Sequence, residues 1–159
     1  MSKTTNAARE APKFHFDTSN IEWKNFVTEG CYYRILDVNV PARTADMIVK
    51  FEPNARCLNH RHVARTMSFV LEGELHVIEK TPDGKTRKTV KPAGTFSADA
   101  TNEVHIEGGG EHGGVVYFSM RGDSDHIYDF VNDDMSLRRV ITIQDFYRDF
   151  QNWSSDRKP

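Results

Sequence analysis

The chain has 159 residues and a formal net charge of −2, with 21 lysines and arginines against 23 acidic residues. This is the length of one ordinary domain, enough to bury most of the apolar surface around a single core. Mixed charges with a sum near zero give no surface suited to a nucleic-acid backbone, and no apolar run approaches the roughly 18 residues of a membrane span. We therefore expect a globular protein that binds neither nucleic acid nor membrane.

The start of the chain, MSKTTNAAREAPK, lacks the apolar centre of a secretion signal, which predicts a cytoplasmic protein. We expect residues 1–13 to form a disordered tail, residues 14–151 a single domain and residues 152–159 a C-terminal tail. Cys31 and Cys57 form no CxxC pair, so in a reducing compartment they are expected to be free, buried thiols. Cys57 lies just before His60, and its role as a ligand or as a thiol lining a site stays open.

Most of the chain has the pattern of short strands separated by turns, rich in β-branched and aromatic residues. Strands are predicted over residues 32–40, 45–51, 69–71, 75–79, 86–90, 104–107 and 115–120. Turns are predicted at residues 52–55, 72–74, 82–85 and 92–94, and a loop over residues 108–114. Evenly spaced strands with turn signals indicate an all-β fold, either a small barrel or a double-sheet jelly roll.

The end of the chain has a helical pattern instead. Its apolar residues recur at positions i, i+3, i+4 and i+7, namely Ile143, Phe146, Tyr147 and Phe150. Thr142 can cap the N-terminus of this helix, and Asp145 stands where the acid of a capping box belongs. We expect one amphipathic helix packed against the β body.

Two histidines one residue apart, His60 and His62, suggest a metal site. Side chains at i and i+2 of a strand share a face and lie about 6.6 Å apart along it. That separation lets two imidazoles converge on one ion at about 2.0–2.1 Å each. Two histidines on a solvated strand would show the same pattern, so the interpretation depends on the surrounding residues.

Those surroundings resemble the cupin family from about Tyr32 to Met120. The first motif of that family runs from a glycine through HxH and a glutamate to a second glycine, and the second motif runs from a PxG-like turn to one histidine. The matching positions are Asn54, His60, His62, Gly73, Gly94 and His105. Asn54 replaces the first glycine, since both residues tolerate positive φ. The resemblance implies a cupin-type double-stranded β-helix, or jelly-roll barrel, with a C-terminal helix and a metal held by His60, His62 and His105.

The glutamate of the first motif is missing. Counting back from Gly73 leads to Thr66 and then Met67, and neither side chain carries a carboxylate. We therefore expect three histidines and no acid, with Thr66 at most hydrogen-bonded to a metal-bound water. Three neutral imidazoles leave a divalent ion with its full +2 charge, which strengthens its action as a Lewis acid and its affinity for anions.

Such a site resembles the three-histidine branch of the cupins that contains the acetylacetone-cleaving and dihydroxyacetophenone-type dioxygenases. Residues 21–30 and 140–150 are also similar to the flanks of that branch. The resemblance implies a non-heme iron dioxygenase that cleaves a C–C bond in a small diketone or hydroxyketone. Fe²⁺ is the favoured ion, although imidazole also suits zinc, manganese, nickel and copper. The alternatives are a non-catalytic metal- or small-molecule-binding cupin and a zinc or manganese isomerase.

Other residues near the histidines are weaker candidates. Glu103 shares its strand parity with His105 and could be a fourth ligand or a base, and Arg56 or Arg65 could hold a substrate carboxylate. His76 is expected on the face opposite to Leu75 and Val77, and His112 in a solvated loop.

Parity also predicts the faces of the strand that follows the HxH pair. Ser68 and Val70 should face inward, whereas Met67 and Phe69 should face outward. A literal GxGxxG over residues 108–113 is followed by a strand pattern, so we reject a dinucleotide site. Cupins often pair through sheet edges, which implies a homodimer.

Overall fold

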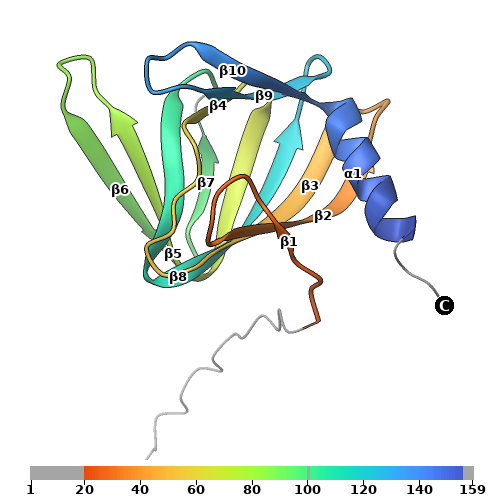
Figure 1. The fold of residues 1–159 in the computed structure, drawn as a ribbon, viewed down its shortest axis with the longest axis horizontal. Coiled ribbons are helices and arrows are strands. Elements are labelled where there is room, and N and C mark those ends of the chain that lie inside the picture. The colour runs from red at the N-terminus through yellow and green to blue at the C-terminus, as the bar shows by residue number, and fades with distance from the viewer. Residues whose placement is uncertain (1–19, 100, 156–159) are drawn as a thin grey trace, which may run out of the picture.

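The structure, a computed structural model, describes residues 20–99 and 101–155; the predicted tail over residues 1–13 lies outside them. The described chain forms one antiparallel sheet that curls on itself, with one helix at its C-terminal end (Figure 1). The elements are β1 (Lys24–Asn25), β2 (Cys31–Asn39), β3 (Thr44–Phe51), β4 (His60–His62), β5 (Arg65–Lys80), β6 (Thr86–Pro92), β7 (Phe96–Asp99), β8 (Val104–Arg121), β9 (His126–Val131), β10 (Leu137–Thr142) and α1 (Ile143–Ser155). The predicted all-β architecture with a C-terminal helix is confirmed.

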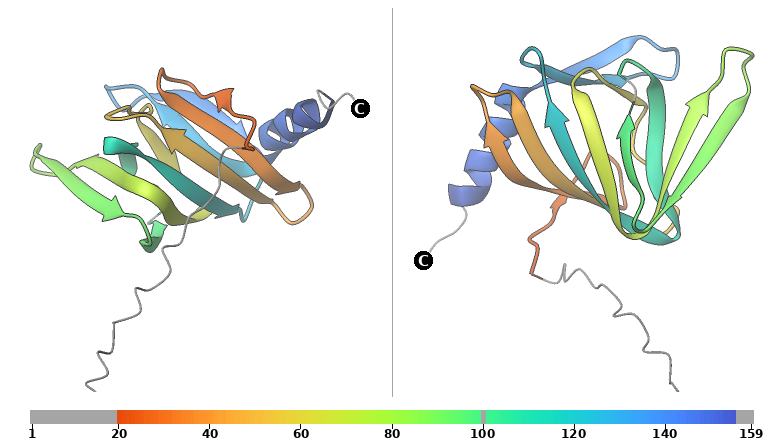
Figure 2. Two further views of the ribbon diagram at one scale, coloured as in Figure 1. Left: turned by 90° about the horizontal axis from the view of Figure 1, so that it is seen from below. Right: turned by 180° about the vertical axis from the view of Figure 1, so that it is seen from behind.

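Strand β8 is the centre of the sheet, because it pairs with β3, β4 and β5. The main path runs β1-β2-β3-β8-β4-β9-β10, and β5 adds β6 and β7. The β5–β6 hairpin projects at one end of the curled sheet, and α1 covers the other end beside β2 and β3 (Figure 2). The inner face between these two ends holds most of the apolar core.

Two predicted interruptions between strands, one turn and one loop, are wrong. The turn at residues 72–74 and the loop at residues 108–114 both lie inside long strands, β5 and β8, that pair along most of their length. Gly73 adopts a φ of 62° at a point where the register shifts, so it bends β5 without ending it. A Cβ at Gly73 would lie 2.2 Å from the carbonyl oxygen of Gly113. These glycines therefore permit close backbone approach, which the sequence pattern does not distinguish from a turn.

The other predicted turns are confirmed by the backbone. Asn54 has a φ of 61°, as expected for a residue that replaces glycine, and Gly84 and Gly94 have φ values of 79° and 89°. The predicted faces of β5 are also confirmed, since Ser68 and Val70 are each 1% exposed while Phe69 is only partly buried. Cys31 and Cys57 are free and buried, as predicted.

Helix α1 begins with the predicted capping box. The backbone N–H of Thr142 donates to Asp145 Oδ2 at 2.9 Å, and the Asp145 N–H donates to Thr142 Oγ1 at 3.3 Å. The helix extends beyond the predicted apolar pattern and includes residues 152–155, which the sequence predicts to lie in a C-terminal tail. Trp153 explains the extension, because it is 1% exposed and packs edge-on against Tyr33 with ring centroids 5.0 Å apart.

No helix among residues 20–99 and 101–155 is both long and apolar enough to cross a bilayer.

Candidate metal centre

Four buried side chains meet inside the barrel. His60 and His62 come from β4, and His105 and Glu107 come from β8. They are between 4% and 6% exposed, and one potential ligand atom from each lies within 4.8 Å of all the others. The register explains the meeting, because His60 is paired directly with His105 across the two strands. The structure thus brings together the three histidines identified from the sequence.

Glu107 corrects the prediction that no acid belongs to this group. Its Oε2 lies 3.3 Å from Nε2 of His60, and its Oε1 lies 3.7 Å from Nε2 of His105. The cupin pattern places its acid near Thr66, and strand parity suggests Glu103 as an alternative. Glu107 follows His105 by two residues and therefore shares its face of β8. The same alternation that suggested Glu103 could have identified Glu107.

The outer nitrogens of two histidines are fixed by hydrogen bonds. His60 Nδ1 lies 3.0 Å from the carbonyl oxygen of Leu58, and His62 Nδ1 lies 2.7 Å from Thr66 Oγ1. The Thr66 hydroxyl donates to the carbonyl of Ala64 at 3.1 Å, so it accepts from His62. Because carbonyl oxygens only accept, both rings carry their proton on Nδ1. Their Nε2 lone pairs consequently face the centre of the group, as metal ligation requires.

The spacing of these atoms fits a bound ion. Nε2 of His60 and Nε2 of His62 lie 3.1 Å apart, and both atoms belong to the cluster of potential ligand atoms. Two nitrogens bound at right angles to one ion at about 2.1 Å would be about 3 Å apart. Nε2 of His105 is buried and has no hydrogen-bond partner. A buried nitrogen of this kind normally has a partner in native proteins. A cation between the rings and Glu107 would bind the Nε2 atoms and the carboxylate together.

Electrostatics also favour one positive charge at this place. Burial alone would raise the pKa of Glu107, but the His105 and His60 rings beside its carboxylate hold that pKa well below its ordinary value. Burial alone would lower the pKa of His60, but Cys57 and Glu107 raise it well above the usual value. Burial, followed by the charge of His60, lowers the pKa of His62 to about 3. Glu107 is therefore ionised and His62 neutral, and either a proton or a metal ion can compensate the carboxylate.

The group lies between an apolar and a polar space. A cavity of about 30 Å³ borders His60, His62 and Glu107, and its other walls are mainly aromatic and aliphatic side chains. It has room for one or two water-sized groups. On the other side, a pocket of about 120 Å³ reaches His105 and is lined by charged and polar residues, including Glu103 and Lys91. Apolar and polar ligand groups can thus approach the centre from different directions.

A buried carboxylate outside the barrel holds β4 in place. Arg61, between the two histidines, donates from Nε to Asp129 Oδ2 at 2.8 Å, and Asp129 also contacts His126 Nε2 at 2.5 Å. Asp129 is fully buried on β9, opposite Arg61 in the register. Sequence reasoning missed this pair, because nothing local links residues 61 and 129. It fixes the outer face of a strand that has only three residues.

The weaker candidates lie outside the four-residue group. Glu103 is exposed and only lines the polar pocket beside His105, and Arg56 is exposed and lines an outer pocket. Cys57 lines the centre, since its Sγ accepts from the Glu107 N–H at 3.3 Å and lies 3.5 Å from His60 Nδ1.

Two further histidines lie away from the centre. His76 pairs with Glu74 on the face predicted for it. His112 is exposed as predicted, but it lies on β8 and not in the predicted loop.

Comparison with known proteins agrees with this architecture. A family model described as a ChrR cupin-like domain matches residues 11–125. A search of curated proteins for relatives in sequence found no match.

Solved structures show the same fold. An acetylacetone dioxygenase from Acinetobacter johnsonii has 11% identity and a TM-score of 0.68, with 96% of this chain and 99% of that chain covered. A candidate acetylacetone dioxygenase from Methylibium petroleiphilum PM1 has 18% identity and a TM-score of 0.67, with coverages of 90% and 97%. An RmlC-like cupin from Ralstonia eutropha JMP134 has 10% identity and a TM-score of 0.68, with coverages of 88% and 85%. At sequence identities this low, the similarity in structure establishes a shared fold and not a shared activity.

Proposed function

This chain belongs to the ChrR cupin-like domain family, and on that premise we propose that it is a metal-dependent dioxygenase that cleaves a C–C bond in a small diketone or hydroxyketone. The observation that carries the proposal is the buried group of three histidines and one glutamate inside the barrel. The similarity in fold to acetylacetone dioxygenases supports the substrate class.

In this proposal His60, His62, His105 and Glu107 hold the ion, and iron(II) is the favoured metal. When bound, iron(II) would supply Lewis-acid and one-electron chemistry for an enolate and dioxygen. Glu107 lowers the net charge of the occupied site from +2 to +1, which revises the charge expected from three neutral imidazoles alone. A positive site still favours an anionic enolate over a neutral ketone.

The surrounding residues prepare the reaction by position and by exclusion of water. Thr66 and the carbonyl of Leu58 hold the rings of His62 and His60 with their Nε2 atoms inward. Apolar side chains such as Phe118 and Met120 line the 30 Å³ cavity, which suits a molecule as small as dioxygen. The polar pocket beside His105 suits the oxygens of the substrate.

The test is oxygen uptake by protein loaded anaerobically with iron(II), with acetylacetone and a panel of hydroxyketones as substrates. We expect uptake with at least one compound, and both atoms of ¹⁸O₂ in the two cleavage products. His105→Ala should abolish uptake, whereas His112→Ala, which changes an exposed histidine of the same strand, should not. Stoichiometric iron without uptake for any compound would contradict the proposal.

A second candidate is a non-catalytic metal-binding cupin, or a zinc or manganese isomerase. It is favoured by the small size of the cavity next to His60 and His62, which leaves little room for an organic substrate on that side. Elemental analysis of protein grown without added metal separates the two ideas. One zinc or manganese per chain, together with no oxygen uptake after exchange to iron, would support this second function.

A further inference from the structure

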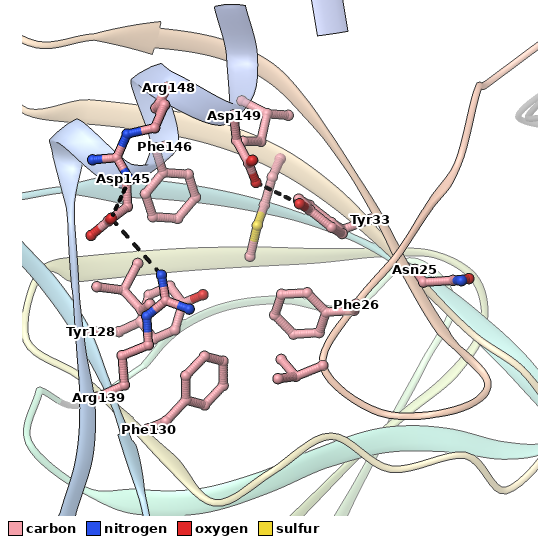
Figure 3. Close-up of a pocket in the computed structure, with 14 residues that line it drawn as sticks. Asn25, Phe26, Tyr33, Tyr128, Phe130, Arg139, Asp145, Phe146, Arg148 and Asp149 are labelled. Carbon is pink, nitrogen blue, oxygen red and sulfur yellow. Dashed lines mark hydrogen bonds and ion pairs between the residues drawn. The ribbon is translucent and has the colours of Figure 1, made fainter. Parts of the chain in front are cut away.

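A second cavity lies behind the apolar side of the metal centre. It has a volume of about 260 Å³ and is formed by residues of α1, β2, β3, β9 and β10 and by the segment after β1. Figure 3 shows the rings of Phe26, Tyr128, Phe130 and Phe146 around this space. At about 260 Å³, this cavity is slightly smaller than the usual range of small-molecule sites, and it combines aromatic walls with charged groups, as such sites do.

Two arginines at the rim share one carboxylate oxygen. Asp145 Oδ1 lies 3.9 Å from Arg139 and 3.4 Å from Arg148, and Figure 3 shows both guanidinium groups turned toward it. The other oxygen of Asp145 accepts both hydrogen bonds from Thr142 in the helix cap. Within residues 20–99 and 101–155, the two guanidinium groups therefore share one carboxylate oxygen, although each has several N–H donors. This arrangement leaves donors for a second carboxylate.

The remaining acid at the rim is already engaged. Asp149 Oδ2 accepts the hydroxyl of Tyr33 at 2.5 Å, as Figure 3 shows. Burial, followed by this contact with Asp149, raises the pKa of Tyr33, so the phenol keeps its proton and continues to donate. Asp149 is thus directed toward Tyr33, whereas Asp145 is directed toward the helix cap and the arginines.

One tyrosine hydroxyl belongs to the lining of the cavity. Tyr128 is 8% exposed, and its side chain lines the 260 Å³ cavity. Its ring lies edge-on to His60, with centroids 6.4 Å apart. A phenol hydroxyl beside an open cavity can donate a hydrogen bond to a ligand or accept one from it.

One layer of side chains separates this cavity from the metal centre. Phe26, Met47, Tyr128 and Phe130 line both the 260 Å³ cavity and the 30 Å³ cavity that borders His60 and Glu107. The two spaces therefore share a wall, and the larger one does not include any of the four metal-ligand candidates. A ligand in the larger cavity would therefore not need a metal ion in order to bind.

We propose that this cavity is a binding site for a small aromatic carboxylate, with the ring among Phe26, Phe130 and Phe146 and the carboxylate on Arg139 and Arg148. Guanidinium groups bind carboxylates in preference to neutral amides because charge-assisted hydrogen bonds are the stronger ones. The Tyr128 hydroxyl provides a further donor or acceptor within the cavity. The site is independent of the proposed oxygenase reaction, although it adjoins the same centre.

The test is calorimetric titration of the full-length protein, as isolated and after chelation of metal, with three probes of similar size. The probes are phenylacetate, the neutral phenylacetamide and the cationic phenethylamine. We expect saturable binding of one phenylacetate per chain in both preparations, and at least about tenfold weaker binding of the amide and the amine. Equal binding of acid and amide, preference for the amine, or no saturable phenylacetate binding would overturn the proposal.

Charge-removing variants locate the site. Arg139→Gln and Arg148→Gln should each weaken phenylacetate binding about tenfold. Arg138→Gln is the matched control, since Arg138 is the neighbour of Arg139 on β10 but does not line the cavity. The two arginines of the site are mostly exposed, so these variants should fold, which circular dichroism checks. Unchanged affinity in both Arg139→Gln and Arg148→Gln would place the probe elsewhere.

Discussion

Thr66 accepts a hydrogen bond from Nδ1 of His62 at 2.7 Å, at the position where the cupin sequence pattern has its glutamate. Thr66 is 1% exposed, and its hydroxyl donates a hydrogen bond to the carbonyl oxygen of Ala64 at 3.1 Å. Thr66 therefore orients the ring of His62 through Nδ1, the nitrogen on the side away from the centre. The acid of the centre comes instead from Glu107 on β8, the strand that pairs with β5.

Removing the hydroxyl of Thr66 should weaken metal binding without removing a ligand candidate. Thr66→Val keeps the shape of the side chain but leaves the His62 Nδ1–H without its acceptor. We expect metal affinity to fall about 10–100-fold, the usual effect of losing the group that orients a ligating histidine. Competition with a chromophoric chelator measures this. Thr66→Ser, which restores the hydroxyl, should stay within a few-fold of wild type, and equal losses in both variants would contradict the orienting role.

Glu107 should contribute to metal binding as a charge, and an exposed neighbour provides the control. Glu107→Gln keeps the size of the side chain but removes the anion that lies 3.3 Å from Nε2 of His60. We expect metal affinity to fall by at least about tenfold, as it does when groups around a metal are changed. Glu103→Gln, on the exposed side of His105, should bind metal as the wild type does. Inductively coupled plasma mass spectrometry after dialysis compares the two, and retention of full metal content by Glu107→Gln would exclude the carboxylate as a ligand.

The bend in β5 should depend on the absence of a side chain at Gly73. A Cβ there would lie 2.2 Å from Gly113 O and would also have to adopt a φ of 62°. We expect Gly73→Ala to lower the free energy of unfolding by about 2–5 kcal/mol, from the left-handed conformation together with the backbone clash. Gly84→Ala has the same conformational cost at φ 79° but meets open space, so about 1 kcal/mol is expected. Urea denaturation measures both, and equal losses would show that the close approach of β5 and β8 is unimportant.

The cap of α1 should make stability depend on pH. Burial alone would raise the pKa of Asp145, but its hydrogen bonds from Thr142 and the nearby Arg148 and Arg139 hold it below 3.8. A carboxyl whose pKa is depressed by folding stabilises the protein above its ordinary pKa, and this stabilisation is lost as the pH falls through the lower, folded value. We expect Asp145→Asn to cost about 0.5–1 kcal/mol at pH 7 and almost nothing near pH 2. Denaturation at several pH values checks this, and a difference that persists at low pH would assign it to something other than the charge.

Local patterns in the sequence predicted much of the fold. Alternation and turn residues predicted most strands, the positive φ of Asn54, and the inward faces of Ser68 and Val70. The capping box at Thr142 was predicted because all of its parts lie within four residues. Glycines were misinterpreted, since Gly73 and the run over residues 108–114 serve close contact between β5 and β8, and a contact between distant segments has no local signature.

The sequence by itself determined that His60 and His62 share one face of a strand and that His105 belongs to a second motif, because strand alternation is a property of adjacent residues. The tertiary structure alone decided that His105 lies opposite His60, that Glu107 completes the group, and that Asp129 holds Arg61. Each of these depends on the register between strands that are far apart in the chain. Register is set by the packing of the whole barrel, and a shift of one residue would turn these side chains to the other face.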